Sequence, residues 1–132
     1  MRLHHVSIRT ADIFRAIAFY QHLGFETETR FTTGMTLACW MTGSLGRLEL
    51  IQIPEPQPAA DAFGDPHYVG YYHLSLEVAD VVGLLQILTD QAGGTVLLDP
   101  QIQQIGEHDY RVAFLADPDG LPIELLQRLE QG

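Results

Sequence analysis

The sequence predicts an α+β fold made of two tandem β-α-β-β-β modules, whose mixed sheet curls around a cleft. Two observations lead to this prediction. The segment His5–Asp12 is repeated at His73–Asp80, where His, Ser, Ala and Asp recur at the same places. In each copy, an alternating strand pattern is followed by the spacing of an amphipathic helix. Because two copies are too few for a solenoid, we expect two related halves that pack as a pair.

The repeated segment begins each half as a half-buried strand, with apolar residues on one face and polar residues on the other. The apolar face is expected to pack under a helix. The polar face lines a concave cleft if the sheet curls. Its side chains are those of His5, Ser7 and Arg9 in the first copy, and of His73, Ser75 and Glu77 in the second.

A helix is expected after each strand. Asp12 and Asp80 occupy N-cap positions, and Gly24 and Gly93 are positioned to end the helices in the left-handed conformation. Between them, apolar residues follow helical spacing. We assign the buried stripes to Phe14, Ile17, Ala18 and Leu23, and to Val81, Leu84, Leu85, Leu88 and Ala92.

Three strands should complete each half. We expect them at 26–31, 35–41 and 47–53, and at 95–98, 110–116 and 123–128. The sequence Asp-Pro-Asp-Gly at 117–120 predicts a tight turn before the last strand. Four prolines mark 54–70 as a linker. We therefore predict one domain over residues 1–132, with module 1 at 1–53, the linker at 54–70 and module 2 at 71–132.

Composition narrows the class of protein. The chain has 132 residues and a formal net charge of −10, which argues against binding to a nucleic acid backbone. No apolar run is long enough to span a bilayer, and the N-terminus does not resemble a signal peptide. The single cysteine, Cys39, excludes an internal disulfide and is interpreted as a buried thiol in an apolar run. We expect a cytoplasmic protein.

Four residues are candidates for a metal site. Glu49 and Glu124 are lone acids in apolar strands, and each lies in the last strand of its half. A carboxylate in such a place is destabilising unless it is paired, coordinated or solvated. With His5 and His73, each half offers one imidazole and one carboxylate, which together suit Zn, Ni, Co, Mn or Fe. Ordinary structural roles remain open for all four residues. His5, beside His4, could be a surface residue, and His73 could be a core histidine bonded to a backbone carbonyl. Both glutamates could lie on solvated faces.

The chain resembles the vicinal-oxygen-chelate superfamily over essentially its whole length. The resemblance rests on the strand and helix that begin at His5, on their repeat at His73, and on the ending Asp117–Gly120 followed by Ile123-Glu124-Leu125. It implies paired β-α-β-β-β modules around a metal. It also implies a homodimer in which each site combines the first module of one chain with the second module of its partner.

Within this superfamily the ligand set resembles that of bacterial glyoxalase I, which uses His, Glu, His and Glu. His5, Glu49, His73 and Glu124 match all four. Extradiol dioxygenases use two His and one Glu, methylmalonyl-CoA epimerase typically has Gln at the second place, and bleomycin-resistance proteins lack the ligands. Arg9 matches an arginine that holds a glutathione carboxylate. Two features depart from the family pattern: Ile53 replaces an asparagine, and 103–108 replaces a Lys-Gly-Gly segment.

The resemblance implies conversion of a methylglyoxal–thiol hemithioacetal to a lactoyl thioester, with glutathione as co-substrate and Ni, Co, Zn or Mn as the metal. Glu124 would mainly carry the proton, with Glu49 as its partner. We expect Ser7 and Ser75 to satisfy neighbouring backbone groups rather than ligands, and His67 and His108 to lie in loops. The alternatives are a dioxygenase, an epimerase, a thiol transferase, a non-catalytic binding protein of the bleomycin-resistance type, or a regulatory protein with an abandoned site.

Overall fold

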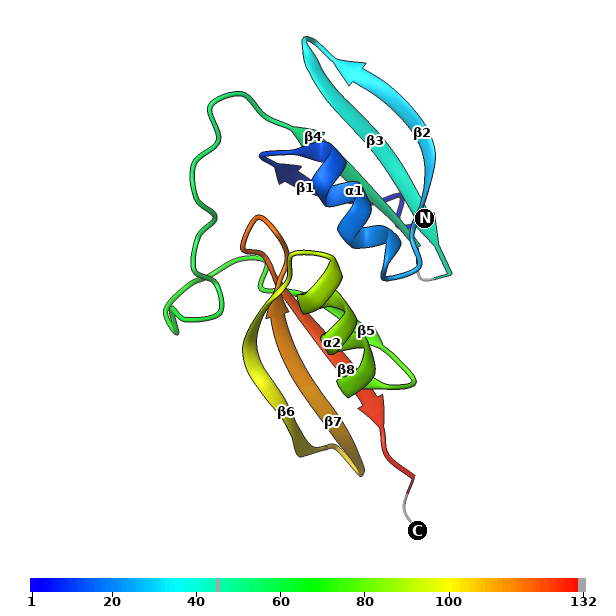
Figure 1. Ribbon diagram of the computed structural model, residues 1–132, viewed down its shortest axis with the longest axis vertical. Helices are drawn as coiled ribbons and strands as arrows, with labels where there is room; N and C mark the ends of the chain where they lie inside the picture. Colours follow the sequence, from blue (N-terminus) through cyan, green and yellow to red (C-terminus); the bar gives the residue numbers. More distant parts are fainter. Residues whose placement is uncertain (45, 131–132) are drawn as a thin grey trace. The chain divides into compact units, whose positions relative to one another are not determined.

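The computed structural model describes residues 1–44 and 46–130 and confirms the α+β class. The chain divides into two compact units, Met1–Pro58 and Ala59–Gly132. Each unit contains one helix and one four-stranded mixed sheet, and both follow the order β-α-β-β-β (Figure 1). The repeat in the sequence therefore corresponds to a repeat in the fold.

The first unit forms a sheet with the strand order β1-β4-β3-β2. β1 pairs with β4 in parallel, and the remaining pairs are antiparallel. Parallel pairing needs a long connection rather than a hairpin, and α1 with two further strands lies between β1 and β4 along the chain. The elements are β1 (Val6–Thr10), α1 (Ile13–Gln21), β2 (Glu26–Thr33), β3 (Thr36–Gly43) and β4 (Gly46–Gln52).

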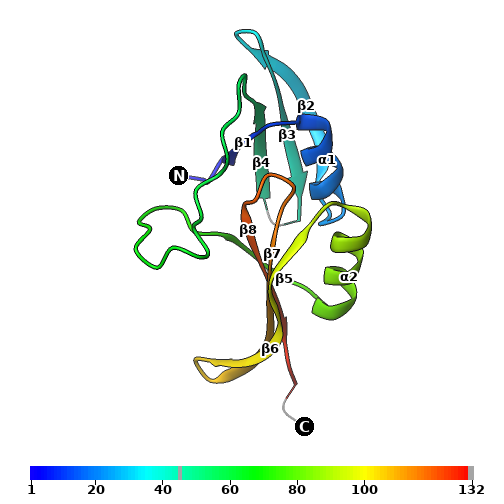
Figure 2. The same cartoon turned by 60° about the vertical axis from the view of Figure 1, so that its left-hand side comes forward.

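The second unit has the same topology, with the strand order β5-β8-β7-β6 and a parallel β5–β8 pair. In both units, the helix covers one face of the unit's own sheet (Figure 2), so the polar side chains of the first strand point away from the helix. The elements are β5 (Leu74–Glu77), α2 (Val81–Gln91), β6 (Thr95–Ile105), β7 (His108–Ala116) and β8 (Pro122–Arg128).

Both predicted helix caps are confirmed. The Asp12 carboxylate accepts hydrogen bonds from the backbone N–H groups of Phe14 and Arg15, at 3.1 and 3.2 Å. The Asp80 carboxylate accepts one from Gly83 N–H at 3.0 Å. These contacts satisfy N–H groups that have no partner within the helix, and they fix the start of each helix directly after its strand.

The predicted stripe of α1 is confirmed at Ile17 but is wrong at Phe14 and Ala18. Phe14 is 64% exposed, and Ala18 is exposed as well. The buried face instead begins one residue earlier, at the first residue of the helix. It comprises Ile13, Ala16, Ile17, Phe19 and Tyr20. In α2 the prediction is better, since Val81, Leu85 and Leu88 are buried.

β6 is longer than predicted, and His108 does not lie in a loop. The strand continues through the glutamine-rich segment to Ile105, which pairs with His108 at the start of β7. Pro100 argues against a continuous strand in the sequence, because proline has no backbone N–H to donate to a β-ladder. The sheet accommodates the interruption through a shift in register between Leu98 and Gln101. His67 does lie in a loop, as expected.

Residues 54–70, which we predict as a linker, form no helix or strand. Cys39 is buried, as expected, and burial raises the pKa of its thiol.

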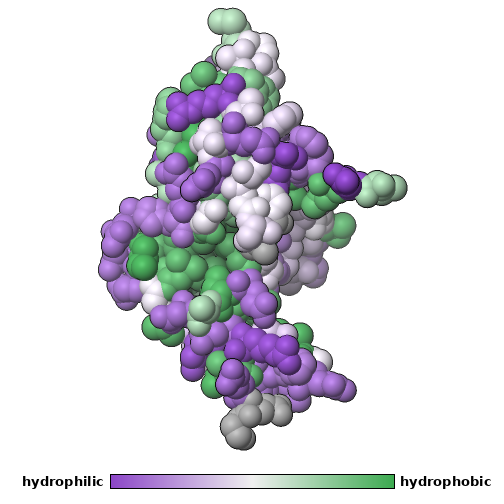
Figure 3. Space-filling view, turned by 90° about the vertical axis from the view of Figure 1, so that its right-hand side faces the viewer, coloured by the Kyte–Doolittle hydropathy of each residue, from purple (hydrophilic) through white to green (hydrophobic). Residues whose placement is uncertain are grey.

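On the face shown in Figure 3, hydrophilic residues dominate near the C-terminus. Across residues 1–44 and 46–130, no helix has the length and apolar character that a membrane span requires.

Candidate functional site

In the first unit, strand register brings three polar side chains together. Ser7 on β1 lies opposite Glu49 on β4, and Glu49 lies opposite Trp40 on β3. Directly opposite residues point to the same side of a sheet, so these side chains meet. Ser7 Oγ donates to Glu49 Oε1 at 2.8 Å, and Trp40 Nε1 donates to Glu49 Oε2 at 2.9 Å. Both oxygens of Glu49 thus have a donor.

His5, the residue directly before β1, is the fourth member of this group. Its Nε2 lies 3.5 Å from Glu49 Oε1, and the two side chains are 28% and 15% exposed. Its Nδ1 is 2.8 Å from Nδ1 of His4. The Nε2 atom therefore faces the carboxylate while the opposite ring nitrogen is held by a neighbour.

The second unit builds the same arrangement. Ser75 Oγ donates to Glu124 Oε1 at 2.7 Å, and His73 Nε2 lies 3.5 Å from that same oxygen. The His73 and Glu124 side chains are 20% and 16% exposed. His73 Nδ1 is buried and has no hydrogen-bond partner among the described residues. The equivalence of the two groups extends from sequence position to atomic contact.

The expectation for the two serines is wrong. Ser7 and Ser75 do not serve neighbouring backbone groups but donate to Glu49 and Glu124. The physical reason is the parallel pairing of the first and last strand in each unit, which puts each serine directly opposite its glutamate. Each serine therefore orients a candidate ligand.

The donor atoms fit a divalent cation. A separation of 3.5 Å between imidazole nitrogen and carboxylate oxygen is longer than an ordinary N–H···O hydrogen bond. It is near the roughly 3.0–3.4 Å expected between two atoms that each lie about 2.1 Å from one metal ion. Within either unit, the described residues contain no group of three or more His, Cys, Asp or Glu side chains suited to a metal. One unit alone therefore offers two such donors.

The surroundings of Glu49 favour its charged form. The hydrogen bond from Trp40 is the largest of the effects that lower its pKa, and Ser7, His5 and His4 act in the same direction. Partial burial opposes them. The net result is a pKa below the ordinary value, so Glu49 is a carboxylate at neutral pH, as metal coordination requires.

Arg9, the predicted substrate-binding residue, is exposed on the same face of β1 as Ser7. It lies opposite Ile51 of β4, two residues beyond the Ser7–Glu49 pair. Its binding role stays a prediction.

Trp40 is a residue of this group that the sequence analysis does not identify. The signal that would have revealed it is strand register: pairing the predicted strands 35–41 and 47–53 as a hairpin places Trp40 opposite Glu49. Without a fixed turn, that register is undetermined in the sequence.

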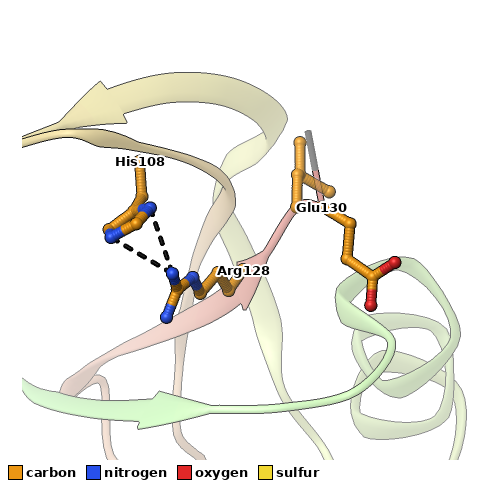
Figure 4. A pocket seen from close by; sticks show the side chains of 4 residues that line it. His108, Arg128 and Glu130 are labelled. Atoms are coloured by element: carbon orange, nitrogen blue, oxygen red, sulfur yellow. Dashed lines mark hydrogen bonds between the residues drawn. The ribbon is translucent and has the colours of Figure 1, made fainter. Parts of the chain in front are cut away.

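The end of the β7–β8 pair carries a separate cavity of about 670 Å³ (Figure 4). Arg128 Nη2 lies 3.1 Å from both ring nitrogens of His108, whereas the carboxylate of Glu130 turns away from them. Glu124 and Arg128 are four positions apart on β8, a distance of about 13 Å along a strand. This open cavity is therefore distinct from the His73–Glu124 pair.

Comparisons with known proteins agree on a family. A model described as Glyoxalase/Bleomycin resistance protein/Dioxygenase superfamily matches residues 2–125. The uncharacterized protein YwkD of Bacillus subtilis (strain 168) is 29% identical over 133 residues, covering 96% of each chain.

Solved structures show the same fold. A glyoxalase family protein from Bacillus cereus superposes with a TM-score of 0.78 at 22% identity, covering 98% of this chain and 95% of its own. A trypanothione-dependent glyoxalase I from Leishmania major superposes with a TM-score of 0.65 at 26% identity, covering 96% and 86%. The arrangement of strands and helices is therefore the one these proteins share.

Proposed function

The chain belongs to the glyoxalase/bleomycin resistance protein/dioxygenase superfamily, and from this premise we propose that it is a divalent-metal enzyme of the glyoxalase I type. The observation that supports the proposal is the His–Glu–Ser group that recurs in both units with matching distances. Superfamily members of the bleomycin-resistance type lack the His and Glu ligands, so the retained His and Glu in both units favour a metal enzyme over a protein that only sequesters a ligand.

In this proposal His5, Glu49, His73 and Glu124 hold one ion of Ni, Co, Zn or Mn. Each unit supplies one imidazole and one carboxylate, so a site with four protein ligands requires one first unit and one second unit. When bound, the metal would supply Lewis-acid stabilisation of negative charge on the two vicinal oxygens of the substrate. We further propose a homodimer in which each site combines the first unit of one chain with the second unit of its partner.

The reaction we propose is the isomerisation of a methylglyoxal–thiol hemithioacetal to a lactoyl thioester. Glu124 removes the proton from C1 as a general base and returns it to C2 as a general acid. In this proposal Glu49 is the partner carboxylate on the opposite side of the reacting carbons, and the two histidines serve as ligands. No atom leaves or enters, so the reaction needs no oxidant or reductant.

Arg9 is proposed to bind a carboxylate of the thiol co-substrate. Glutathione is the first candidate for that thiol. The turn between β6 and β7 includes Gly106 and Glu107, so an acid stands near the place where the family has a lysine. The glyoxalase I from Leishmania major depends on trypanothione, a further thiol to test here.

The experiment begins with metal analysis of the purified protein, followed by removal of metal with a chelator. Lactoyl thioester formation from methylglyoxal and glutathione is then measured with Ni, Co, Zn and Mn added separately. We expect turnover that disappears with chelation and returns with at least one metal. Iron content with oxygen consumption would indicate dioxygenase chemistry instead. A stable protein that binds no metal and shows no turnover would contradict the proposal.

A further inference from the structure

The two units differ at one place beside their glutamates. On β3 the residue opposite Glu49 is Trp40, and on β7 the residue opposite Glu124 is Phe114. Trp40 donates its indole N–H to Glu49 Oε2, whereas a phenyl ring has no donor to offer. Glu124 accepts from Ser75 through Oε1, and its Oε2 accepts no hydrogen bond from a described residue. The two glutamates therefore occupy equivalent positions, but the carboxylate of Glu49 is held through both oxygens and that of Glu124 through one.

The Trp40 ring is itself held in place. It packs edge-on against His4, with ring centroids 4.9 Å apart, and against Phe31, at 5.3 Å. The Arg47 guanidinium lies 5.6 Å from the centre of the indole. That guanidinium is held in turn by Glu28, at 3.3 Å, and by the backbone carbonyl of His4. A donor fixed by packing restrains its acceptor more firmly than a mobile donor would.

Phe114 restrains the imidazole of its unit instead of the carboxylate. It is buried, and its ring packs edge-on against that of His73, with centroids 5.0 Å apart. It also stacks with Tyr72 at 6.0 Å. The second unit therefore orients His73 by aromatic contact and leaves one oxygen of Glu124 without a donor.

We propose that Trp40 is a positioning residue that fixes the carboxylate of Glu49 as a metal ligand, while Phe114 leaves the carboxylate of Glu124 without such a restraint. The proposal rests on the proposed function, because it assigns different tasks to two of the four ligands.

The first test uses fluorescence of the metal-free protein. Trp40 is the sole tryptophan of the chain, so the emission reports directly on the indole beside Glu49. Glu49→Ala should change the wavelength and yield of this emission. Glu26→Gln, which removes an acid at an exposed site on β2, serves as the matched control and should change neither. An unchanged emission in Glu49→Ala would contradict the contact.

The second test measures metal affinity by competition with a chromophoric chelator. Trp40→Phe gives the first unit the residue type that the second unit carries. We expect it to weaken binding by about 10–100-fold, the usual effect of losing an outer-shell partner of a ligand. Trp40→His, which restores an N–H donor, should recover part of the affinity. Phe31→Leu controls for the loss of ring packing and should change affinity less than Trp40→Phe.

The reciprocal variant, Phe114→Trp, places a donor opposite Glu124. We expect kcat to fall by at least tenfold at saturating metal, while metal affinity is kept or improved. Unfolding curves identify a variant that fails to fold, in which case Phe114→His supplies the donor in a smaller ring. Unaltered metal affinity in a folded Trp40→Phe protein would overturn the inference and leave the proposed function standing. Absence of metal binding in the unsubstituted protein would overturn the proposed function itself.

Discussion

At the scale of single residues, the site depends on carboxylates that are half-buried yet paired. A lone acid in an apolar strand is destabilising without a partner, and Ser7 and Ser75 supply that partner in each unit. The serine hydroxyl occupies only one oxygen of its glutamate. Because a carboxylate has about four acceptor sites, both Glu49 and Glu124 keep capacity for a further bond.

Replacing either glutamate with glutamine tests their chemical role. Glu49→Gln and Glu124→Gln keep the side-chain shape and an oxygen that can accept from serine, but they remove the ability to take up a proton. We expect turnover to fall by about 10²–10⁴-fold in Glu124→Gln, with a smaller loss of metal affinity. Steady-state kinetics with parallel metal titrations separates the two effects. Near-normal turnover in either variant would show that the roles are misassigned.

The lowered pKa of Glu49 predicts how the stability of the metal-free protein depends on pH. The folded protein holds the Glu49 carboxylate charged below the ordinary pKa of 4.5, chiefly through Trp40. This stabilisation is present above pH 4.5 and is lost as the pH falls through the lower pKa of the folded state. In Trp40→Phe the loss of packing is independent of pH, but the loss of the hydrogen bond is not.

We therefore expect the free energy of unfolding of Trp40→Phe to differ from that of the unsubstituted protein by about 1–3 kcal/mol at pH 7 and by less in acid. Urea unfolding of both proteins between pH 7 and pH 3 measures this difference. A constant difference over that range would mean that the indole contributes only its packing.

At the scale of elements, each helix depends on the aspartate that separates it from its strand. Asp12→Ala removes the acceptor for Phe14 N–H and Arg15 N–H and should destabilise the protein by about 1 kcal/mol. Asp12→Asn, which keeps an oxygen acceptor, is the matched control and should retain most of the stability. Thermal or denaturant unfolding measures both. Equal stability of the alanine and asparagine variants would contradict the capping role.

Elements with strong local signals were predictable from the sequence. Asp12, Asp80 and the turn at 117–120 each act through hydrogen bonds to their own neighbours, and the turn is confirmed by the Asp117 carboxylate accepting from Asp119 and Leu121 N–H. The alternating polar and apolar pattern also predicted correctly that His5 and Ser7 lie on one face, where both side chains are near Glu49. These features need no knowledge of distant strands.

Features that depend on pairing between distant segments were not predictable. The β6 strand extends past Pro100 only because β7 supplies a partner for it. The buried face of α1, by contrast, does follow helical spacing, through Ile13, Ala16, Ile17 and Tyr20; Phe14 was misplaced because the predicted stripe began one residue too late. The serine and Trp40 contacts to the glutamates likewise follow from strand register, which the alternating pattern alone leaves undetermined.

At the scale of the whole molecule, the repeat is the basis of the proposed site. Each unit folds with its own caps, core and His–Glu–Ser group. Two donors of this kind form a weak site for a divalent ion, whereas four form a complete one with room for substrate oxygens. The proposed function thus requires a combination of two half-sites that are individually insufficient.

The number of metal ions per chain tests this combination. If His5, Glu49, His73 and Glu124 share one ion, the purified protein should bind one ion per chain with a single affinity. His5→Ala and His73→Ala should each weaken that same binding event, because both remove a ligand from one coordination sphere. Isothermal titration of both variants, with His67→Ala in the linker as the control, measures this directly. If the half-sites were independent, each variant would instead lose half of the bound metal and keep the affinity of the remainder.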